Sequence, residues 1–260
     1  MPVMDTLRDE VYRRKLAHRG RGLAELERHV GPVCAEIEAR LGRQDVVRIL
    51  ELGAGYGTTL LELRARYGTR VALHGMNREP RDGNREILLR NAAERGLPVD
   101  DSSPERALPA MAFGNVAAGL PFPDDAFDLV VSQVAWLYFG RKIAVIRDVI
   151  RVLRDDGVAK IDADEVRPGL PPEYARLVEI WQDGALVAFG DYLSRHTMAL
   201  ARAPDGHYLR FGKVPSFGDD LVEVHELDLS TLHAHWDGVK CVYRLRSQPS
   251  APPAATDRET

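Results

Sequence analysis

The segment ILELGAGYGTTLLEL, residues 49–63, decides the fold of this chain. An apolar run ends at Leu52, glycines follow at positions 53, 55 and 57, and a helical pattern comes next. A turn this tight needs residues that tolerate positive φ and lack a Cβ, so that a ligand can approach the backbone. The free N–H groups at the start of the helix lie beside the same turn. The segment therefore predicts a strand, a ligand-binding turn and a helix.

Strand and helix patterns alternate around this segment. Strands are predicted at 46–52, 70–75, 110–115, 128–133 and 158–164, and helices at 59–68, 83–96 and 142–157. Alternation at this spacing indicates βαβ units, which build a parallel, doubly wound sheet. The predicted fold class is therefore α/β.

The two ends of the chain depart from this alternation. Residues 1–45 place apolar residues three and four apart, which predicts an N-terminal helical lid. Residues 171–200 are expected to be helical in two pieces, and an antiparallel finish is expected from strands at 207–213, 221–229 and 239–247. The Pro- and Ala-rich residues 248–260 predict a disordered tail. We expect one domain over 46–247, with its core at 46–165 and a cap segment plus the antiparallel finish at 166–247.

Composition limits the function classes. The chain of 260 residues is 45% hydrophobic and 28% charged, with a net charge of −4, so nothing favours nucleic acid or a membrane as a partner. Neither a signal peptide nor an apolar run of about 18 residues is found, and the predicted location is cytoplasmic. Cys34 and Cys241 are too few for a disulfide framework.

The glycine spacing separates two ligand classes. A dinucleotide site wants G-x-G-x-x-G, with the pyrophosphate on the helix N-terminus. Here the third glycine comes one position early, Thr58 follows it, and Glu51 stands two residues before the first glycine. A carboxylate is unfavourable beside a phosphate but suits a ligand that carries an ammonium group. Both features argue against a nicotinamide dinucleotide.

ELGAGYG (51–57) resembles the first motif of class I S-adenosylmethionine-dependent methyltransferases. A second stretch, GLPFPDDAFDLVVSQVAWLYFGRKIAVIRDVIRVLRDDGVAKI (119–161), resembles a later segment of the same family, and the similarity spans about residues 45–165. The resemblance implies a Rossmann-like sheet of seven strands with a final antiparallel hairpin. It also implies S-adenosylmethionine as cofactor and S-adenosylhomocysteine as product.

The resemblance also implies a role for individual residues. The methionine portion of the cofactor would be held by Glu51, Gly53, Ala54, Gly55 and Gly57. Asn77, at the end of the second strand, would face the ribose hydroxyls. The adenine would meet Asn115, Val116 and Ala117, and backbone near Ser132 and Gln133 would complete the amino-acid pocket.

Asn77 departs from the family pattern, in which Asp or Glu usually faces the ribose. An amide has one acceptor oxygen and two donor hydrogens, so it can bind one hydroxyl each way without a charge. On this reasoning Asn77→Asp would leave cofactor binding intact or tighten it. Asn115 also stands where Asp is frequent, and the linker EPRDGNRE is longer than usual. These departures leave open a structurally bound cofactor or a modified relative of it.

The acceptor is expected to be a small organic molecule, plausibly in secondary metabolism. Aromatic residues predicted to line its site are Tyr12, Trp136, Tyr138, Trp181 and Tyr192. The catalytic base is unknown, with His196 and His207 as weak candidates and His18 as a third. His233 and His235 lack an obvious third ligand, so no metal is expected.

Two other functions remain open on the same fold. One is a cyclase or pericyclic catalyst that keeps S-adenosylmethionine as a structural part, and the other is a non-catalytic binding subunit. Turnover that leaves the cofactor methyl group intact would identify the first, and activity only with a partner chain would identify the second. The oligomeric state is undetermined, with a homodimer as one option.

Overall fold

The computed structural model describes residues 21–99, 108–133, 135–139, 141–163, 178–182, 184–220, 223–226, 232–236 and 241–245. The first part of the predicted lid, residues 1–20, and the predicted tail, 248–260, lie outside these ranges. Within them, no helix is both long enough and apolar enough to span a membrane.

The centre of the structure is a seven-stranded sheet. Its strands are β1 (Val47–Leu52), β2 (Val71–Asn77), β3 (Ala110–Phe113), β4 (Phe127–Ser132), β5 (Leu153–Asp162), β8 (Ala199–Ala203) and β9 (Gly206–Phe211). Their order is β3-β2-β1-β4-β5-β9-β8. The first five strands are parallel, whereas β9 pairs antiparallel with both β5 and β8. This confirms the predicted α/β class and the seven-stranded sheet. An antiparallel hairpin is present, but it is formed by β8 and β9, and the strands expected at 221–229 and 239–247 are wrong as parts of this sheet, because their described residues pair in other sheets.

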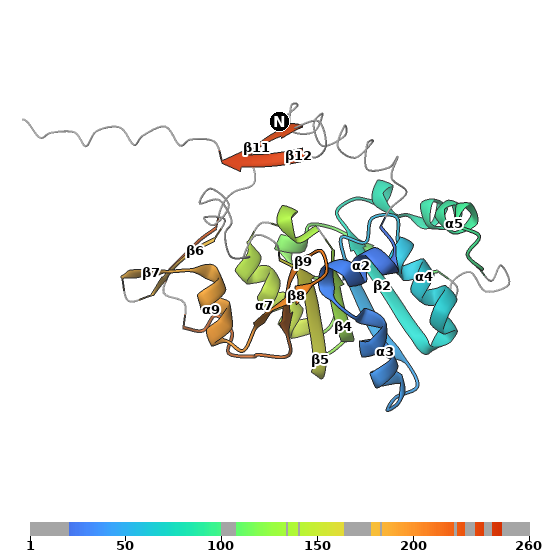
Figure 1. Cartoon of the computed structure of the whole chain (residues 1–260), viewed down its shortest axis with the longest axis horizontal. Helices are drawn as coiled ribbons and strands as arrows, with labels where there is room; N and C mark the ends of the chain where they lie inside the picture. The colour runs from blue at the N-terminus through green and yellow to red at the C-terminus, as the bar shows by residue number, and fades with distance from the viewer. Residues whose placement is uncertain are drawn as a thin grey trace, which may run out of the picture.

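Helices cover both faces of this sheet (Figure 1). On one face α2 (Leu23–Val30), α3 (Val33–Leu41) and α4 (Thr58–Tyr67) share a buried apolar cluster with β1, β4 and β5. On the other face α7 (Lys142–Val152) and α9 (Phe189–Arg195) share a second cluster with the same strands. Helix α5 (Arg85–Glu94) packs beside α4 at the opposite end of the molecule from α9. The role of residues 1–45 as a lid stays a prediction. The two described helices of this segment, α2 and α3, pack against the sheet.

The helix predicted at 142–157 is wrong in its last part, because α7 ends at Val152. Leu153 already pairs with Phe127 of β4, and regular pairing resumes at Val158 after a register shift. A Cβ at Gly157 would lie 2.9 Å from the carbonyl oxygens of both Arg154 and Phe127, so this loop needs glycine. The helical periodicity of the sequence continues past the point where strand pairing ends the helix.

The helices predicted over 171–200 are also largely wrong. In the described part, only α9 is helical; β6 (Val178–Gln182), β7 (Ala185–Val187) and β8 are strands. β8 supplies the first half of the main hairpin, and β6 pairs with both β7 and β10 (Glu223–Glu226) in a second sheet. Strands β11 (Leu232–Trp236) and β12 (Cys241–Leu245) form a third. Strand pairing, local in β6–β7 and β8–β9 and distant in β6–β10, overrides weak helix preference here.

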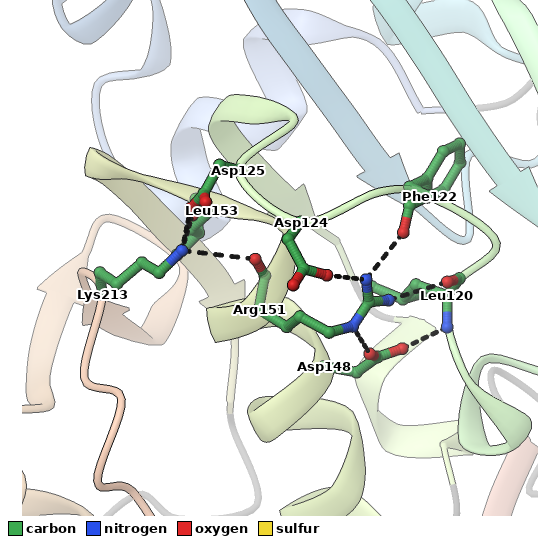
Figure 2. A network of polar contacts seen from close by, with 8 residues as sticks. All are labelled: Leu120, Phe122, Asp124, Asp125, Asp148, Arg151, Leu153 and Lys213. Carbon is green, nitrogen blue, oxygen red and sulfur yellow. Dashed lines mark hydrogen bonds and ion pairs between the residues drawn. The ribbon is translucent and has the colours of Figure 1, made fainter.

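A single arginine ties the loop before β4 to the end of α7 (Figure 2). The guanidinium of Arg151 donates to the Asp148 carboxylate at 2.6 Å and to the Asp124 carboxylate at 2.7 Å. It also donates to the carbonyl oxygens of Leu120 at 3.0 Å and Phe122 at 2.8 Å. Asp148 in turn accepts the Leu120 N–H. These contacts explain physically why the sequence pairs an LPF-acidic segment with an arginine thirty residues later.

We expect Arg151→Ala to lower the free energy of unfolding by about 2 kcal/mol, because several charge-assisted hydrogen bonds are lost together. The matched control is Arg66→Ala, which removes an ion pair to Glu38 whose side chains are both about half exposed. That control should cost no more than about 0.5 kcal/mol. Urea unfolding measures both values, and equal losses would show that the Arg151 network does not hold the loop.

Candidate functional site

The turn after β1 adopts the backbone that its glycines were predicted to allow. Gly53, Gly55 and Gly57 have φ of 74°, 54° and 68°. The Gly53 N–H donates to the Met76 carbonyl oxygen of β2 at 2.8 Å. A Cβ at Gly53 would clash with Ala135, and one at Gly57 would clash with Leu88. At Gly55, by contrast, no described atom lies within 4 Å of a built Cβ, so this side of the turn faces open space.

Asn77 holds the turn by reciprocal hydrogen bonds to Gly55. The Asn77 Oδ1 accepts the Gly55 N–H at 2.8 Å, and Nδ2 donates to the Gly55 carbonyl oxygen at 2.8 Å. The same Nδ2 donates to the Asp82 carbonyl oxygen at 3.1 Å. Both donor hydrogens of the amide are therefore committed to the protein. The ribose contact of Asn77 stays a prediction. In the structure, the side chain of Asn77 holds the glycine turn in place.

These contacts add a cost in stability to Asn77→Asp, whose expected effect on cofactor binding stays a prediction. A carboxylate has no N–H to donate and would face the carbonyl oxygens of Gly55 and Asp82 in a buried position. We expect the change to lower the free energy of unfolding by about 2 kcal/mol. The control is Asn84→Asp, because Asn84 caps α5 by accepting the Ile87 N–H and Asp caps as well as Asn. Comparable melting temperatures for the two variants would contradict the assigned role.

Two buried polar side chains lie at the carboxyl ends of β1 and β4. Glu51 pairs in register with Val131, so Gln133, two residues further on, lies on the same face by strand alternation. Only 4% of Glu51 and 8% of Gln133 is exposed. Glu51 Oε2 and Gln133 Nε2 have no hydrogen-bond partner within the described residues. A buried acceptor and a buried donor thus stand next to the glycine turn, where unpaired polar atoms are costly.

Burial raises the pKa of Glu51 to about 8, against a weaker opposing effect from a hydrogen bond with Thr59. The carboxyl group in the ligand-free protein is therefore largely protonated at neutral pH. A cationic group placed beside it would favour the charged form and displace that proton.

Glu51→Gln is expected to raise stability increasingly as the pH rises from 4.5 to about 8. A carboxyl whose pKa is raised in the folded state stabilises the fold fully below its ordinary value, and that contribution is lost as the pH rises through the raised value. The glutamine has no proton to lose. Thermal unfolding at pH 5 and pH 8.5 measures the difference from wild type. The exposed Glu86→Gln is the control, and a Glu51→Gln gain that does not grow with pH would contradict the burial argument.

The other residues predicted to bind the cofactor lie at the same edge but differ in exposure. Asn115 is exposed, and its Oδ1 accepts the Ala117 N–H at 3.1 Å to cap the turn η3 (Val116–Ala118). Val116 is buried in the apolar cluster under α7, and Ala117 is partly buried. Ser132 is buried and donates to the Leu52 carbonyl oxygen at 3.0 Å, which ties β4 to β1. Ala54 lies in the turn and is 9% exposed.

Of the aromatic residues predicted to contact the acceptor, Trp136 and Tyr192 lie in the same buried apolar cluster. Trp136, in the turn η4 (Ala135–Tyr138), is fully buried, and the Lys142 ammonium lies 4.5 Å from its ring centre. Tyr192 is also fully buried, and its hydroxyl donates to Asp220 at 2.8 Å. Trp181 is partly buried on β6. Tyr12 and the side chain of Tyr138 lie outside the described residues, so acceptor contacts of the whole group stay predictions.

The sheet register separates the two candidate histidines. His207 lies beyond Asp162 of β5, because Tyr208 pairs with Asp162 and the Ala163 N–H donates to the His207 carbonyl oxygen at 3.0 Å. It therefore stands at the carboxyl edge, near the glycine turn. His196 precedes β8 on the side of the amino ends and approaches Asp220 at 3.3 Å. Of the two, only His207 is at the edge where parallel strands bind ligands.

Sequence reasoning missed one pair at this edge. His29 of α2 approaches Asp162 of β5, with 3.5 Å between Nδ1 and Oδ2. A signal for Asp162 exists, since Lys160 and Asp162 are polar residues two apart on an otherwise apolar strand. No local signal exists for His29, whose position depends on how α2 packs. Within the described ranges, no group of three or more His, Cys, Asp or Glu side chains could hold a metal; His233 and His235 have side chains outside them.

Comparison with known proteins gives a family match for the segment that contains Glu51, the glycine turn and Gln133. Residues 50–161 match a family model described as a methyltransferase domain. A curated relative, glycine/sarcosine/dimethylglycine N-methyltransferase from Actinopolyspora halophila, is 33% identical over 124 residues, which are 46% of this chain and 20% of the relative. The chain therefore spans about a fifth of that relative's length.

Solved structures match over about half of the chain. YcgJ from Bacillus subtilis has 25% identity over 49% of this chain and 50% of its own, with a TM-score of 0.35. The [4+2]-cyclase SpnF has 26% identity over 48% and 41%, with a TM-score of 0.37. CrArsM, an arsenic(III) S-adenosylmethionine methyltransferase from Chlamydomonas reinhardtii, has 20% identity over 48% of each chain and a TM-score of 0.35.

Proposed function

Residues 50–161 belong to a methyltransferase domain of the class I S-adenosylmethionine-dependent type, and from this premise we propose that the chain methylates a small organic acceptor. S-adenosylmethionine is the cofactor of this class, and it supplies a methyl group activated on a sulfonium. S-adenosylhomocysteine is the product that remains after transfer.

One observation carries the proposal: the buried, unpaired atoms of Glu51 and Gln133 beside the glycine turn. The amino-acid end of the cofactor carries an ammonium and a carboxylate. The Glu51 carboxylate suits the ammonium, and the Gln133 amide N–H suits the carboxylate. Gly55 leaves open space next to them. The residues present therefore fit the group that the family implies.

The chain's own contribution to the reaction is binding and orientation. Methyl transfer is an in-line displacement, so holding the acceptor in line and near contact can contribute much of the rate. The turn fixed by Asn77 is a rigid part of the pocket in this proposal. The same edge contains Asn115 and Ala117, which we propose as adenine contacts.

The acceptor is proposed to be small. The related enzyme from Actinopolyspora halophila is named for glycine, sarcosine and dimethylglycine, all small amines, which supports a small acceptor here. A role in secondary metabolism and a lid formed by residues 1–45 belong to the same proposal. In support of the lid, Thr59 donates to the Arg21 carbonyl oxygen at 3.4 Å, so the chain enters α2 beside the start of α4.

The test is calorimetry with S-adenosylhomocysteine on wild type, Gly55→Ala and Gly68→Ala. Gly55 and Gly68 have similar φ, 54° and 59°, and no described atom lies within 4 Å of a Cβ built on either. Both alanines should lower stability through backbone strain, and more so at Gly68, whose ψ of −135° lies outside the left-handed helical region. Only the Gly55 methyl enters the proposed ligand space, so only this variant should weaken binding, by at least about tenfold.

Two outcomes would oppose the proposal. If the wild-type protein bound neither S-adenosylmethionine nor S-adenosylhomocysteine, the proposed cofactor would be wrong. Equal affinity in the two alanine variants would place the ligand somewhere other than at the glycine turn.

A further inference from the structure

Asp162 extends the row of buried polar side chains that begins at Glu51. Glu51 pairs with Val131 of β4, and Val131 pairs with Lys160 of β5. Asp162 is therefore two residues beyond this line, beside Gln133 on the neighbouring strand. Glu51, Gln133 and Asp162 are 4%, 8% and 6% exposed, respectively. The three side chains lie on the same face, at the carboxyl ends of adjacent parallel strands.

Helix α2 covers this row and contributes His29. At its start, the Leu23 N–H donates to Glu62 of α4 at 2.6 Å, next to the strand end that bears Glu51. At its other end, Arg28 forms an ion pair with Asp205 in the β8–β9 turn at 2.7 Å, and the Asp205 N–H donates to the Arg28 carbonyl oxygen at 2.9 Å. α2 thus runs from α4 to the β8–β9 hairpin, and His29 lies 3.5 Å from Asp162.

We propose that His29 is the base that deprotonates an amine acceptor, with Asp162 as the residue that positions it. This inference rests on the proposed methyl transfer and names its substrate class. The 3.5 Å between His29 Nδ1 and Asp162 Oδ2 is longer than a hydrogen bond, as catalytic pairs without substrate commonly are. Asp162 on this side favours the proton on Nδ1, which makes Nε2 the proton acceptor.

The surrounding charges fit this role. Lys160, on the same strand face, donates to the Pro32 carbonyl oxygen at 2.7 Å, and burial lowers the pKa of its ammonium. Arg28 is engaged by Asp205, and Arg210 lies 3.7 Å from Glu36. Lys160, Arg28 and Arg210 thus each contact a group other than Asp162, and Asp162 lies 3.5 Å from His29. A carboxylate at this position attracts an ammonium and stabilises a protonated imidazole.

The proton and electron balance is simple. A small amine is mostly an ammonium at neutral pH, since such groups titrate near pH ~10. His29 takes one proton and leaves the neutral amine. The nitrogen lone pair then forms the new C–N bond, and the S–C bond breaks with its electron pair going to sulfur. The methylated ammonium and a thioether result, and the proton on His29 passes to solvent.

The experiment measures S-adenosylhomocysteine formation with glycine, sarcosine, dimethylglycine and ethanolamine as probes. Glycolate and ethylene glycol, which replace the amine by a hydroxyl, are the matched non-amine probes. We expect turnover with at least one amine and none with the hydroxyl compounds. His29→Gln should lower kcat by at least about 100-fold, and Asp162→Asn by about 10-fold or more, with S-adenosylhomocysteine affinity within about twofold of wild type.

Two further variants separate catalysis from structure. Glu86→Gln removes an exposed carboxylate on α5, outside α2 and the strand edge, and it should leave kcat unchanged. Imidazole added to His29→Ala should restore part of kcat, which a loss of packing would not allow.

Each failure has its own meaning. Absence of S-adenosylhomocysteine binding in wild type would overturn the proposed function itself. Binding without turnover of any amine probe would overturn the amine assignment. Turnover that survives His29→Gln, or a loss that imidazole does not restore and that accompanies a lower melting temperature, would overturn the role of His29.

Discussion

Parallel pairing of β1, β4 and β5 is the constraint on which the site depends. Strands that run in the same direction end at one edge, so Glu51, Gln133 and Asp162 meet there although more than a hundred residues separate the first from the last. Glu51 Oε2 and Gln133 Nε2 have no hydrogen-bond partner within the described residues, and burying such atoms is unfavourable. Apolar side chains would pack under α2 at lower cost, so a ligand accounts for these residues better than stability does.

The sequence predicted the parts of the fold that are local. β1, the glycine turn and α4 follow from apolar periodicity and from the need for positive φ at Gly53, Gly55 and Gly57. The parts that failed depend on strand pairing that helical periodicity does not reveal. Leu153 has a helical pattern around it but pairs with Phe127 of β4, which lies outside any short window around it. Residues 199–203 pair with β9, which follows after only two residues, so the turn signal Pro204-Asp205-Gly206 was available but was overlooked.

The residues of the site also differ in whether local sequence could predict them. Glu51 and the glycines could be located from their spacing alone, and the structure places Gly55 against open space. Asn77 was found at the right strand end, but its partners are the peptide groups of Gly55 and Asp82. His29 could not be found, because only the path of α2 across the sheet brings it to Asp162. The two candidate histidines were equivalent in sequence, and the sheet register separated them.

The buried carboxyl group of Glu51 has a consequence for product inhibition. The donor and the spent product of this class carry the same ammonium, so both would have to displace the proton that burial holds on Glu51. Their affinities would then rise together with pH below about 8, while the ratio between them would stay constant. Low pH would weaken the binding of both molecules. Protonation of Glu51 would not favour S-adenosylmethionine over S-adenosylhomocysteine. Any preference for one of the two molecules must come from groups that lie close enough to the sulfur atom to interact with its charge.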